Sequence, residues 1–96
     1  MNEAGWRSFT RLCLKSDNEK MLTSLLDLFL THEEMESIST RCLIVMELLK
    51  QEKTQRCIAE ELHVSISKIT RGSNELKRVS PELINFLVKN IVSSTR

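Results

Sequence analysis

Glycine and proline are scarce in this chain of 96 residues, which has two glycines and one proline, whereas leucine, glutamate, lysine and serine are common. No stretch alternates between apolar and polar residues and ends in glycine-rich turns, as half-exposed strands do. The composition therefore predicts an all-α fold. A chain of this length is expected to form one small domain, residues 1–96.

Long hydrophobic runs are also missing. The longest, residues 42–46, is far too short to cross a bilayer, and residues 1–11 contain no apolar signal core. Three cysteines, an odd number with no close pairing, fit a reducing compartment better than a disulfide framework. We therefore expect a cytoplasmic protein with no membrane partner.

The chain has no signature of catalysis or of metal binding. There is no Ser/His/Asp set, no phosphate-binding loop and no pair of carboxylates in an apolar setting. The three cysteines, at positions 13, 42 and 57, fall within helical patterns and are expected to be small core residues. His32 and His63 have no cysteine or acid at metal-ligand spacing. Neither an enzyme nor a metal site is expected.

Apolar spacing and capping residues predict dimerisation-core helices over residues 3–52. The first helix, residues 3–15, has apolar side chains three and four positions apart. Ser16-Asp-Asn-Glu19 has the form of a capping box and predicts a second helix that continues to Phe29. Thr31-His-Glu-Glu34 is another such box and predicts a long helix that ends near residues 50–52.

A last core helix is predicted over residues 81–92. Ser80-Pro-Glu82 supplies a cap, a first-turn proline and a first-turn acid. Leu83, Leu87 and Ile91 would line the buried face of this helix, and residues 93–96 are expected to fray.

Two stretches are too apolar for a small monomer. Residues 25–30 and 42–46 carry hydrophobic side chains around most of the helix circumference, so these helices should be buried on every side. A chain of this size buries only roughly 60–65% of its unfolded surface. A twofold homodimer is the commonest solution, and a tight monomer with a few exposed leucines is the alternative.

Residues 54–78 have the spacing of a helix-turn-helix. Apolar residues recur one helical turn apart on both sides of a predicted turn, and Ser65 can cap the second helix. The positions expected to hold the two helices together are Ile58, Ala59, Leu62, Val64, Ile66 and Ile69. A short helix held at a steep angle on another helix is a common way to bring side chains into the major groove of DNA.

The charge pattern of this motif suits a nucleic-acid partner. Lys68 would be the third residue of the second helix, where the helix dipole favours an acid, and no Asp or Glu occurs between Ser65 and Asn74. The net charge of +1 conceals −3 in residues 1–52 and +4 in residues 53–96. Such an asymmetry is typical of a surface that meets phosphates. The alternatives are a solvated basic face and a helical protein-interaction module, which would not need these cations.

The sequence Ile69-Thr-Arg-Gly-Ser-Asn74, followed by Leu76-Lys77, resembles the tryptophan repressor family. Shorter matches at the family's intervals occur at residues 28–31, 39–41, 47–49, 54–56, 61–62 and 81–83. The resemblance implies an intertwined all-helical homodimer with six helices per chain. It further implies a repressor of genes for tryptophan biosynthesis or acquisition that binds double-stranded operator DNA with L-tryptophan as corepressor. A helix-turn-helix regulator with another ligand, or with none, is the nearest alternative.

The resemblance also implies a binding site for L-tryptophan. Arg41 and Arg71 would sandwich the indole ring and hold the carboxylate, a role that suits the flat, charged guanidinium. Thr31 would lie near that carboxylate, and the backbone carbonyls of Leu28 and Leu30 would receive the ammonium. Without the resemblance, Arg41 would be expected to pair with Glu33 or Glu34.

Two further positions belong to the implied ligand site. Gly72 would let the flat ring approach the backbone, and tight helix packing is the alternative reason for a glycine there. Glu75 stands where well-known members have a small hydroxyl residue. Its carboxylate could bind the ammonium, crowd the pocket or change the ligand preference.

The resemblance places the DNA contacts on both helices of the motif. Gln55 and Arg56 would approach DNA from the first helix. The groove-facing residues of the second helix would be Ile66, Ser67, Lys68, Thr70, Asn74 and Lys77. The family usually has glycine where this chain has His63, so His63 is expected to adopt a positive φ. The chain starts close to its first helix, so we expect the flexible arm of longer members to be missing.

Overall fold

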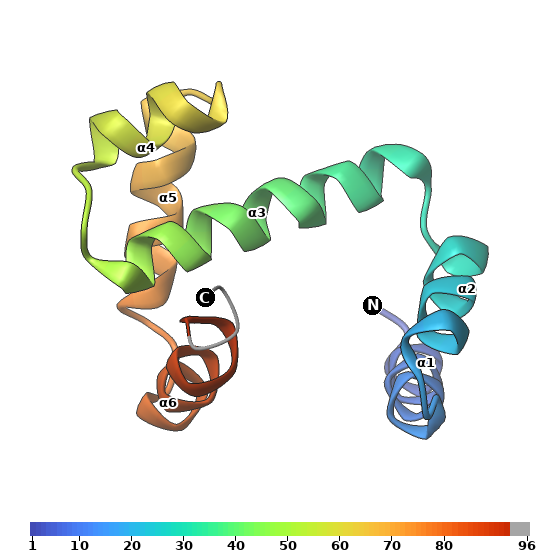
Figure 1. Cartoon of the computed structure of the whole chain (residues 1–96). Helices are drawn as coiled ribbons and strands as arrows, with labels where there is room; N and C mark the ends of the chain where they lie inside the picture. The colour runs from blue at the N-terminus through green and yellow to red at the C-terminus, as the bar shows by residue number, and fades with distance from the viewer. Residues whose placement is uncertain (93–96) are drawn as a thin grey trace. The chain divides into compact units, whose positions relative to one another are not determined.

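The computed structural model describes residues 1–92, which form six α-helices and a final π-helical turn (Figure 1). The elements are α1 (Glu3–Lys15), α2 (Glu19–Phe29), α3 (His32–Lys50), α4 (Gln55–Leu62), α5 (Ile66–Leu76), α6 (Pro81–Leu87) and η1 (Val88–Val92). No strand occurs in residues 1–92, and the all-α prediction is confirmed. The chain divides into two compact units, Met1–Met35 and Glu36–Arg96.

The first unit contains α1, α2 and the start of α3. Asn18 caps α2, because its side-chain oxygen accepts a hydrogen bond from the Met21 N–H at 2.8 Å. The capping box predicted at Ser16 is therefore wrong. The Ser16 N–H still bonds to the carbonyls of Leu12 and Cys13, so this residue ends α1 and cannot start the next helix.

An aromatic cluster connects the two helices of this unit. The Phe9 ring centroid lies 5.7 Å from that of Trp6 and 5.5 Å from that of Phe29, which it meets edge to face. Neither α1 nor α2 has a buried residue, and Trp6 and Phe29 are 54% and 53% exposed. The cluster holds the helices together without forming a closed core.

The capping box predicted at the start of α3 is confirmed. The Thr31 N–H donates to Glu34 Oε1 at 2.8 Å, and the Glu34 N–H donates to Thr31 Oγ1 at 3.1 Å. The hydrogen bond from the Thr31 backbone, followed by that of its hydroxyl, holds the pKa of the Glu34 carboxyl below its usual value.

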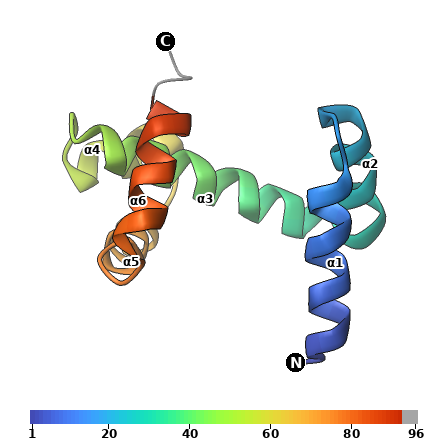
Figure 2. The same cartoon turned by 90° about the horizontal axis from the view of Figure 1, so that it is seen from below.

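The second unit contains the buried core. Ile44 of α3, Ile58 and Ala59 of α4 and Ile69 of α5 are buried together, and Leu48, Leu62 and Val64 pack against them. α4 lies lengthwise in Figure 2, where α5 is seen nearly end-on, so the two helices cross steeply (Figures 1 and 2). Most of the positions predicted to hold these two helices together do so.

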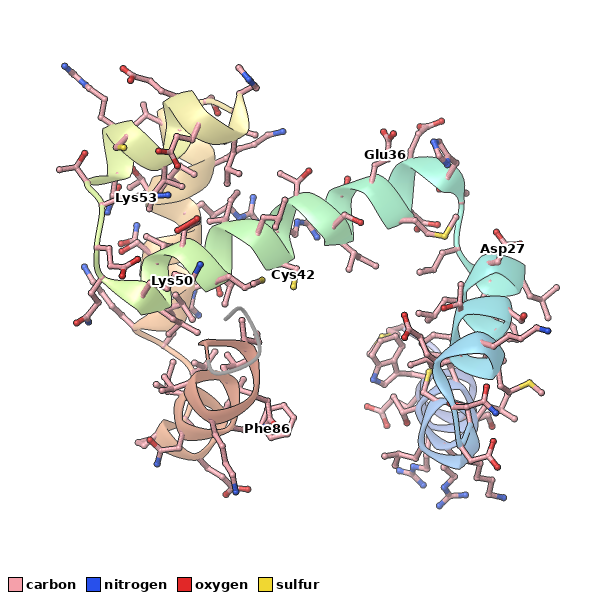
Figure 3. All side chains as sticks on the ribbon, in the orientation of Figure 1. Asp27, Glu36, Cys42, Lys50, Lys53 and Phe86 are labelled. Atoms are coloured by element: carbon pink, nitrogen blue, oxygen red, sulfur yellow. The ribbon has the colours of Figure 1, made fainter. Side chains whose placement is uncertain are left out.

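Three expectations about burial are wrong. Ile66 is 49% exposed and lies outside the cluster, whereas Leu62 and Val64 pack against it. Leu83 is 41% exposed rather than buried. Cys42 is exposed because it lies two positions before the buried Ile44 and so points to the opposite side of α3 (Figure 3). The other two cysteines are only partly buried.

The last helix starts where the sequence predicts. The Leu83 N–H donates to Ser80 Oγ at 3.2 Å, and Pro81 occupies the first turn. The helix then changes to the π form at Val88. Leu87 and Ile91 are half-buried, whereas the Phe86 ring is 60% exposed and projects away from α6 (Figure 3). The fraying expected for residues 93–96 lies outside the described residues.

Candidate functional site

The turn between α4 and α5 depends on one residue in a left-handed conformation. His63 has φ 56° and ψ 45°, as its position predicts. Its N–H donates to the Glu60 carbonyl, and the Val64 N–H donates to the Ala59 carbonyl at 3.0 Å. These two bonds form a Schellman motif, which ends α4 and turns Val64 toward the core. They offset a backbone cost of about 1–2 kcal/mol for a residue with a Cβ atom.

The start of α5 combines a cap with a cation. Ser65 Oγ accepts from the Lys68 N–H at 3.4 Å and lies 3.0 Å from Ser67 Oγ. Lys68 is exposed at the third position of α5, where the backbone N–H groups already carry partial positive charge. The first turn of α5 contains no acid to compensate it. This arrangement favours an anion at the helix start.

Most cations of the second unit have no carboxylate partner. Within residues 1–92, no ion pair involves Arg41, Arg56, Lys68, Arg71 or Lys77, and all five side chains are exposed. In particular, the pairing of Arg41 with Glu33 or Glu34 does not occur. Exposed cations without a carboxylate partner attract phosphates.

Lys53 behaves differently from these cations. Its ammonium lies 2.6 Å from Glu61 Oε2 and 3.3 Å from Glu47 Oε2, so it bridges α4 and α3 (Figure 3). The hydrogen bond to Glu61 raises the pKa of Lys53 and lowers that of Glu61. Partial burial, followed by the Glu61 charge, raises the pKa of the neighbouring Cys57 thiol, so this cysteine is a poor nucleophile. No signal in the sequence pointed to this bridge, because Lys53 lies between two predicted helices and no motif marks it.

The predicted DNA-contacting residues of α4 and α5 lie in the same unit. Gln55 and Arg56 form the first turn of α4, after the cap residue Thr54, whose Oγ1 accepts from the Cys57 N–H. The Thr70 hydroxyl donates to Gln55 Oε1 at 3.0 Å and joins the two helices. Side-chain exposure is the property that the other predicted contacts share: Ile66, Ser67, Lys68, Asn74 and Lys77.

Gly72 has a packing role. A Cβ atom at this position would lie 3.0 Å from Ile44 Cγ2, so that this side chain would have to shift, and 3.5 Å from Leu48 Cδ1, an ordinary contact distance. Gly72 therefore lets α5 lie directly on α3. Arg41 precedes Ile44 by one helical turn, and Arg71 directly precedes Gly72, so both arginines are close along the chain to the residues of this contact.

The remaining predicted ligand residues divide between the two units. Glu75 belongs to the second unit, and its Oε1 lies 3.6 Å from the Nη1 of Arg78, with both side chains largely exposed. Leu28, Leu30 and Thr31 belong to the first unit. Leu28 is 75% exposed, and the Thr31 hydroxyl serves the capping box. Neither unit by itself contains the whole predicted set.

Two classes of feature are missing from the described chain. Residues 1–92 contain no group of three or more His, Cys, Asp or Glu side chains that could hold a metal ion. No helix in that part of the chain is long and apolar enough to cross a membrane.

The comparisons with known proteins agree on one family. The family model described as "Trp repressor protein" matches residues 4–91. A "Trp operon repressor homolog" of Chlamydia trachomatis serovar D is 47% identical over 89 residues, which cover 93% of this chain and 95% of that protein. Relatives with the same name are 47% identical in Chlamydia caviae (94% and 88% covered) and 44% identical in Vibrio vulnificus strain YJ016 (80% and 76% covered).

Proposed function

The chain belongs to the Trp repressor family of DNA-binding transcriptional repressors, and we propose that it is a homodimeric repressor of genes for tryptophan biosynthesis or acquisition, with L-tryptophan as corepressor. The observation that carries this proposal is the exposed side of α5. It has no acid between Ile66 and Asn74, and its two cations, Lys68 and Arg71, have no carboxylate partner within residues 1–92. At 11 residues, α5 is about 16 Å long, a length that fits a major groove.

The steep crossing of α4 and α5 supports an orientation for this contact. The core residues Ile58 and Ile69 are fully buried between the helices, so the opposite side of α5 is available to a partner. Arg56 at the start of α4 and Lys68 at the start of α5 would meet the phosphates of one groove. Lys53 pairs with both Glu47 and Glu61 and so compensates half of their combined negative charge.

The exposed apolar side chains support a homodimer. α1, α2 and α6 have no buried residue, and helices of 7–13 residues are marginal without packing on an apolar face. The side chains that a partner chain would cover include Trp6, Leu28, Phe29, Ile38, Leu43 and Phe86. A second copy would supply the missing cover, and two motifs related by a twofold axis would meet half-sites about 34 Å apart.

The contact between Gly72 and Ile44 supports a ligand site beside it. Ile44 offers an apolar surface, and Arg41 and Arg71, close along the chain, have guanidinium groups without carboxylate partners in the described chain. An indole could stack between these groups while its carboxylate meets their N–H donors. In the intertwined dimer, Leu28, Leu30 and Thr31 of the partner chain would complete the site. The ligand would act by favouring one placement of α5.

A regulator for another amine-bearing ligand is the second candidate, and Glu75 favours it. The Glu75 carboxylate pairs only loosely with Arg78 in an exposed position, so it could turn to an ammonium group at little cost. If the ligand had no ammonium group, the Glu75 carboxylate would lie near the carboxylate of the ligand without a cation between them. The two like charges would repel each other.

Calorimetric titration with L-tryptophan tests the ligand, and a gel-shift assay with and without L-tryptophan tests the repressor. We expect saturable binding of one L-tryptophan per chain and DNA binding that requires it. Indole-3-propionate, which lacks the ammonium, is expected to bind more weakly if Glu75 lines the site. Tight DNA binding that ignores L-tryptophan would contradict the corepressor, and absence of any DNA binding would contradict the function itself.

A further inference from the structure

A hydrogen bond between two side chains connects α4 and α5. Thr70 Oγ1 donates to Gln55 Oε1 at 3.0 Å, across fifteen positions of the sequence. Gln55 is the first residue of α4 and is partly buried, whereas Thr70 follows the buried Ile69 and is exposed. The bond therefore joins the start of one helix to the middle of the other.

This bond decides which hydrogen-bonding groups remain available. A primary amide has one oxygen acceptor and one NH₂ donor, and a threonine hydroxyl has a single hydrogen. Because the hydroxyl hydrogen goes to Gln55 Oε1, Thr70 has no hydrogen left for another acceptor. The Nε2 of Gln55 keeps both hydrogens, and they point away from the oxygen that Thr70 holds. The bond thereby fixes the plane of the Gln55 amide and leaves its NH₂ group free to donate to a partner.

The surroundings of this donor favour a phosphate over a base edge. Adenine recognition by glutamine requires the acceptor and the donor of the amide together, and Thr70 already occupies one of the two lone pairs of that acceptor. The first turn of α4 contains no acid, and the exposed Arg56 beside Gln55 forms no ion pair within residues 1–92. Phosphate oxygens only accept hydrogen bonds, and the first helix of such a motif crosses the DNA backbone.

We propose that Thr70 is a positioning residue that fixes the Gln55 amide as a donor to a DNA phosphate. This inference rests on the proposed function for the DNA, whereas the orientation of the amide is a property of the free protein. Thr70 then acts through Gln55 and does not itself donate to DNA, in contrast to its predicted direct contact.

A double-mutant cycle tests the proposal on the full-length protein. Thr70→Val removes the hydroxyl and keeps the branched shape, and Gln55→Ala removes the donor. We expect DNA affinity to fall about threefold for Thr70→Val and about tenfold for Gln55→Ala. The double variant should be no weaker than Gln55→Ala alone. Thr70→Ser, which keeps the hydroxyl, should restore affinity, and Thr23→Val on α2 is the matched control without loss.

Two other measurements separate the possible outcomes. Binding to an unrelated duplex at low salt should fall by the same factors, because a phosphate contact is independent of sequence. A loss confined to one sequence would overturn the phosphate contact. Independent, multiplying losses in the cycle would show that Thr70 contacts DNA directly and would also overturn the proposal.

Nuclear magnetic resonance of the free protein tests the orientation without DNA. The ¹⁵N order parameter of the Gln55 side-chain amide should decrease in Thr70→Val and return to its original value in Thr70→Ser. Unchanged order in Thr70→Val would overturn the positioning role. If the order falls while the unaltered protein binds no duplex, the positioning role stands and the proposed function fails.

Discussion

The two compact units of the chain differ in what holds each together. In its described part, the second unit has four buried residues, an ion-pair bridge through Lys53 and a glycine that brings α5 onto α3. The first unit has an aromatic cluster and three helix caps but no buried side chain. Local hydrogen bonds thus define the helices of both units, whereas only the second unit has a core of its own.

This difference indicates where a partner chain matters most. Burial of apolar surface is the main favourable contribution to folding, and caps contribute only about 1 kcal/mol each. The first unit therefore requires cover from outside, and in the proposed dimer the partner supplies it. The second unit can position α4 and α5 with its own residues. Four predictions test or refine this comparison.

The largest effect on stability is expected in the core of the second unit. Ile58→Ala removes a fully buried side chain of α4 that belongs to the same core cluster as Ile44 of α3 and Ile69 of α5. It should cost about 3 kcal/mol and lower the Tm by about 10–20 °C. Circular dichroism during heating measures this change.

Phe29→Ala is the matched change in the first unit. Phe29 is half exposed in one chain, so its loss should shift the dimer toward monomer in sedimentation and lower the Tm less than Ile58→Ala does. A protein that sediments as a folded monomer before any substitution would contradict the proposed role of the partner. Equal Tm losses for the two variants would contradict the difference between the units.

The second prediction reverses the charge of Lys68. Glutamate at the third position of α5 would agree with the helix dipole, so Lys68→Glu should leave the Tm unchanged or raise it. It should weaken operator binding by about 100-fold or more, because each half of the dimer loses a cation and gains an anion. A gel-shift assay measures the loss, and Lys20→Glu on α2 provides the control. Undiminished DNA binding by Lys68→Glu would show that the start of α5 is not part of the DNA interface.

The third prediction concerns Arg71 and the response to ligand. If its guanidinium stacks on the indole and meets the carboxylate, Arg71→Ala should lower tryptophan affinity about tenfold, since 1.4 kcal/mol corresponds to one decade. DNA binding should then become insensitive to added tryptophan. Calorimetry checks the affinity, with Arg7→Ala on α1 as a matched control. Unchanged tryptophan binding combined with weaker DNA binding would identify Arg71 as a phosphate contact instead.

Local signals in the sequence predicted most of the helix limits. The caps at Thr31, Ser65 and Ser80 depend on neighbours three positions away, which the sequence displays directly. The positive φ of His63 was predicted from the family resemblance instead. The prediction failed at Ser16 because this residue could either end α1 or cap α2. The backbone hydrogen bonds of α1 extend to the Ser16 N–H, so Ser16 ends α1.

Long-range features could not be predicted in the same way. Three of these features join residues 8–28 positions apart in the sequence: the contact of Gly72 with Ile44, the bond from Thr70 to Gln55 and the ion pair of Lys53 with Glu61. The ion pair of Lys53 with Glu47 spans a shorter distance along the chain. No period or motif encodes such pairs. The exposure of Leu83 has a different cause, since apolar periodicity shows which face a helix buries but not whether that face is covered by the same chain.

The smallest effect is expected at the capping box of α3, at the end of the first unit. The folded-state pKa of Glu34 is lowered by the Thr31 backbone and hydroxyl, so ionised Glu34 stabilises the folded chain. This contribution is present above the unfolded pKa of about 4.3 and is lost as the pH falls through the lowered folded value. Glu34→Gln should retain the cap geometry and flatten the decline of Tm between neutral and acidic pH. Glu33→Gln, one position earlier and outside the box, is the matched control, and an equal flattening in both variants would show that general charge, rather than the box, sets the dependence.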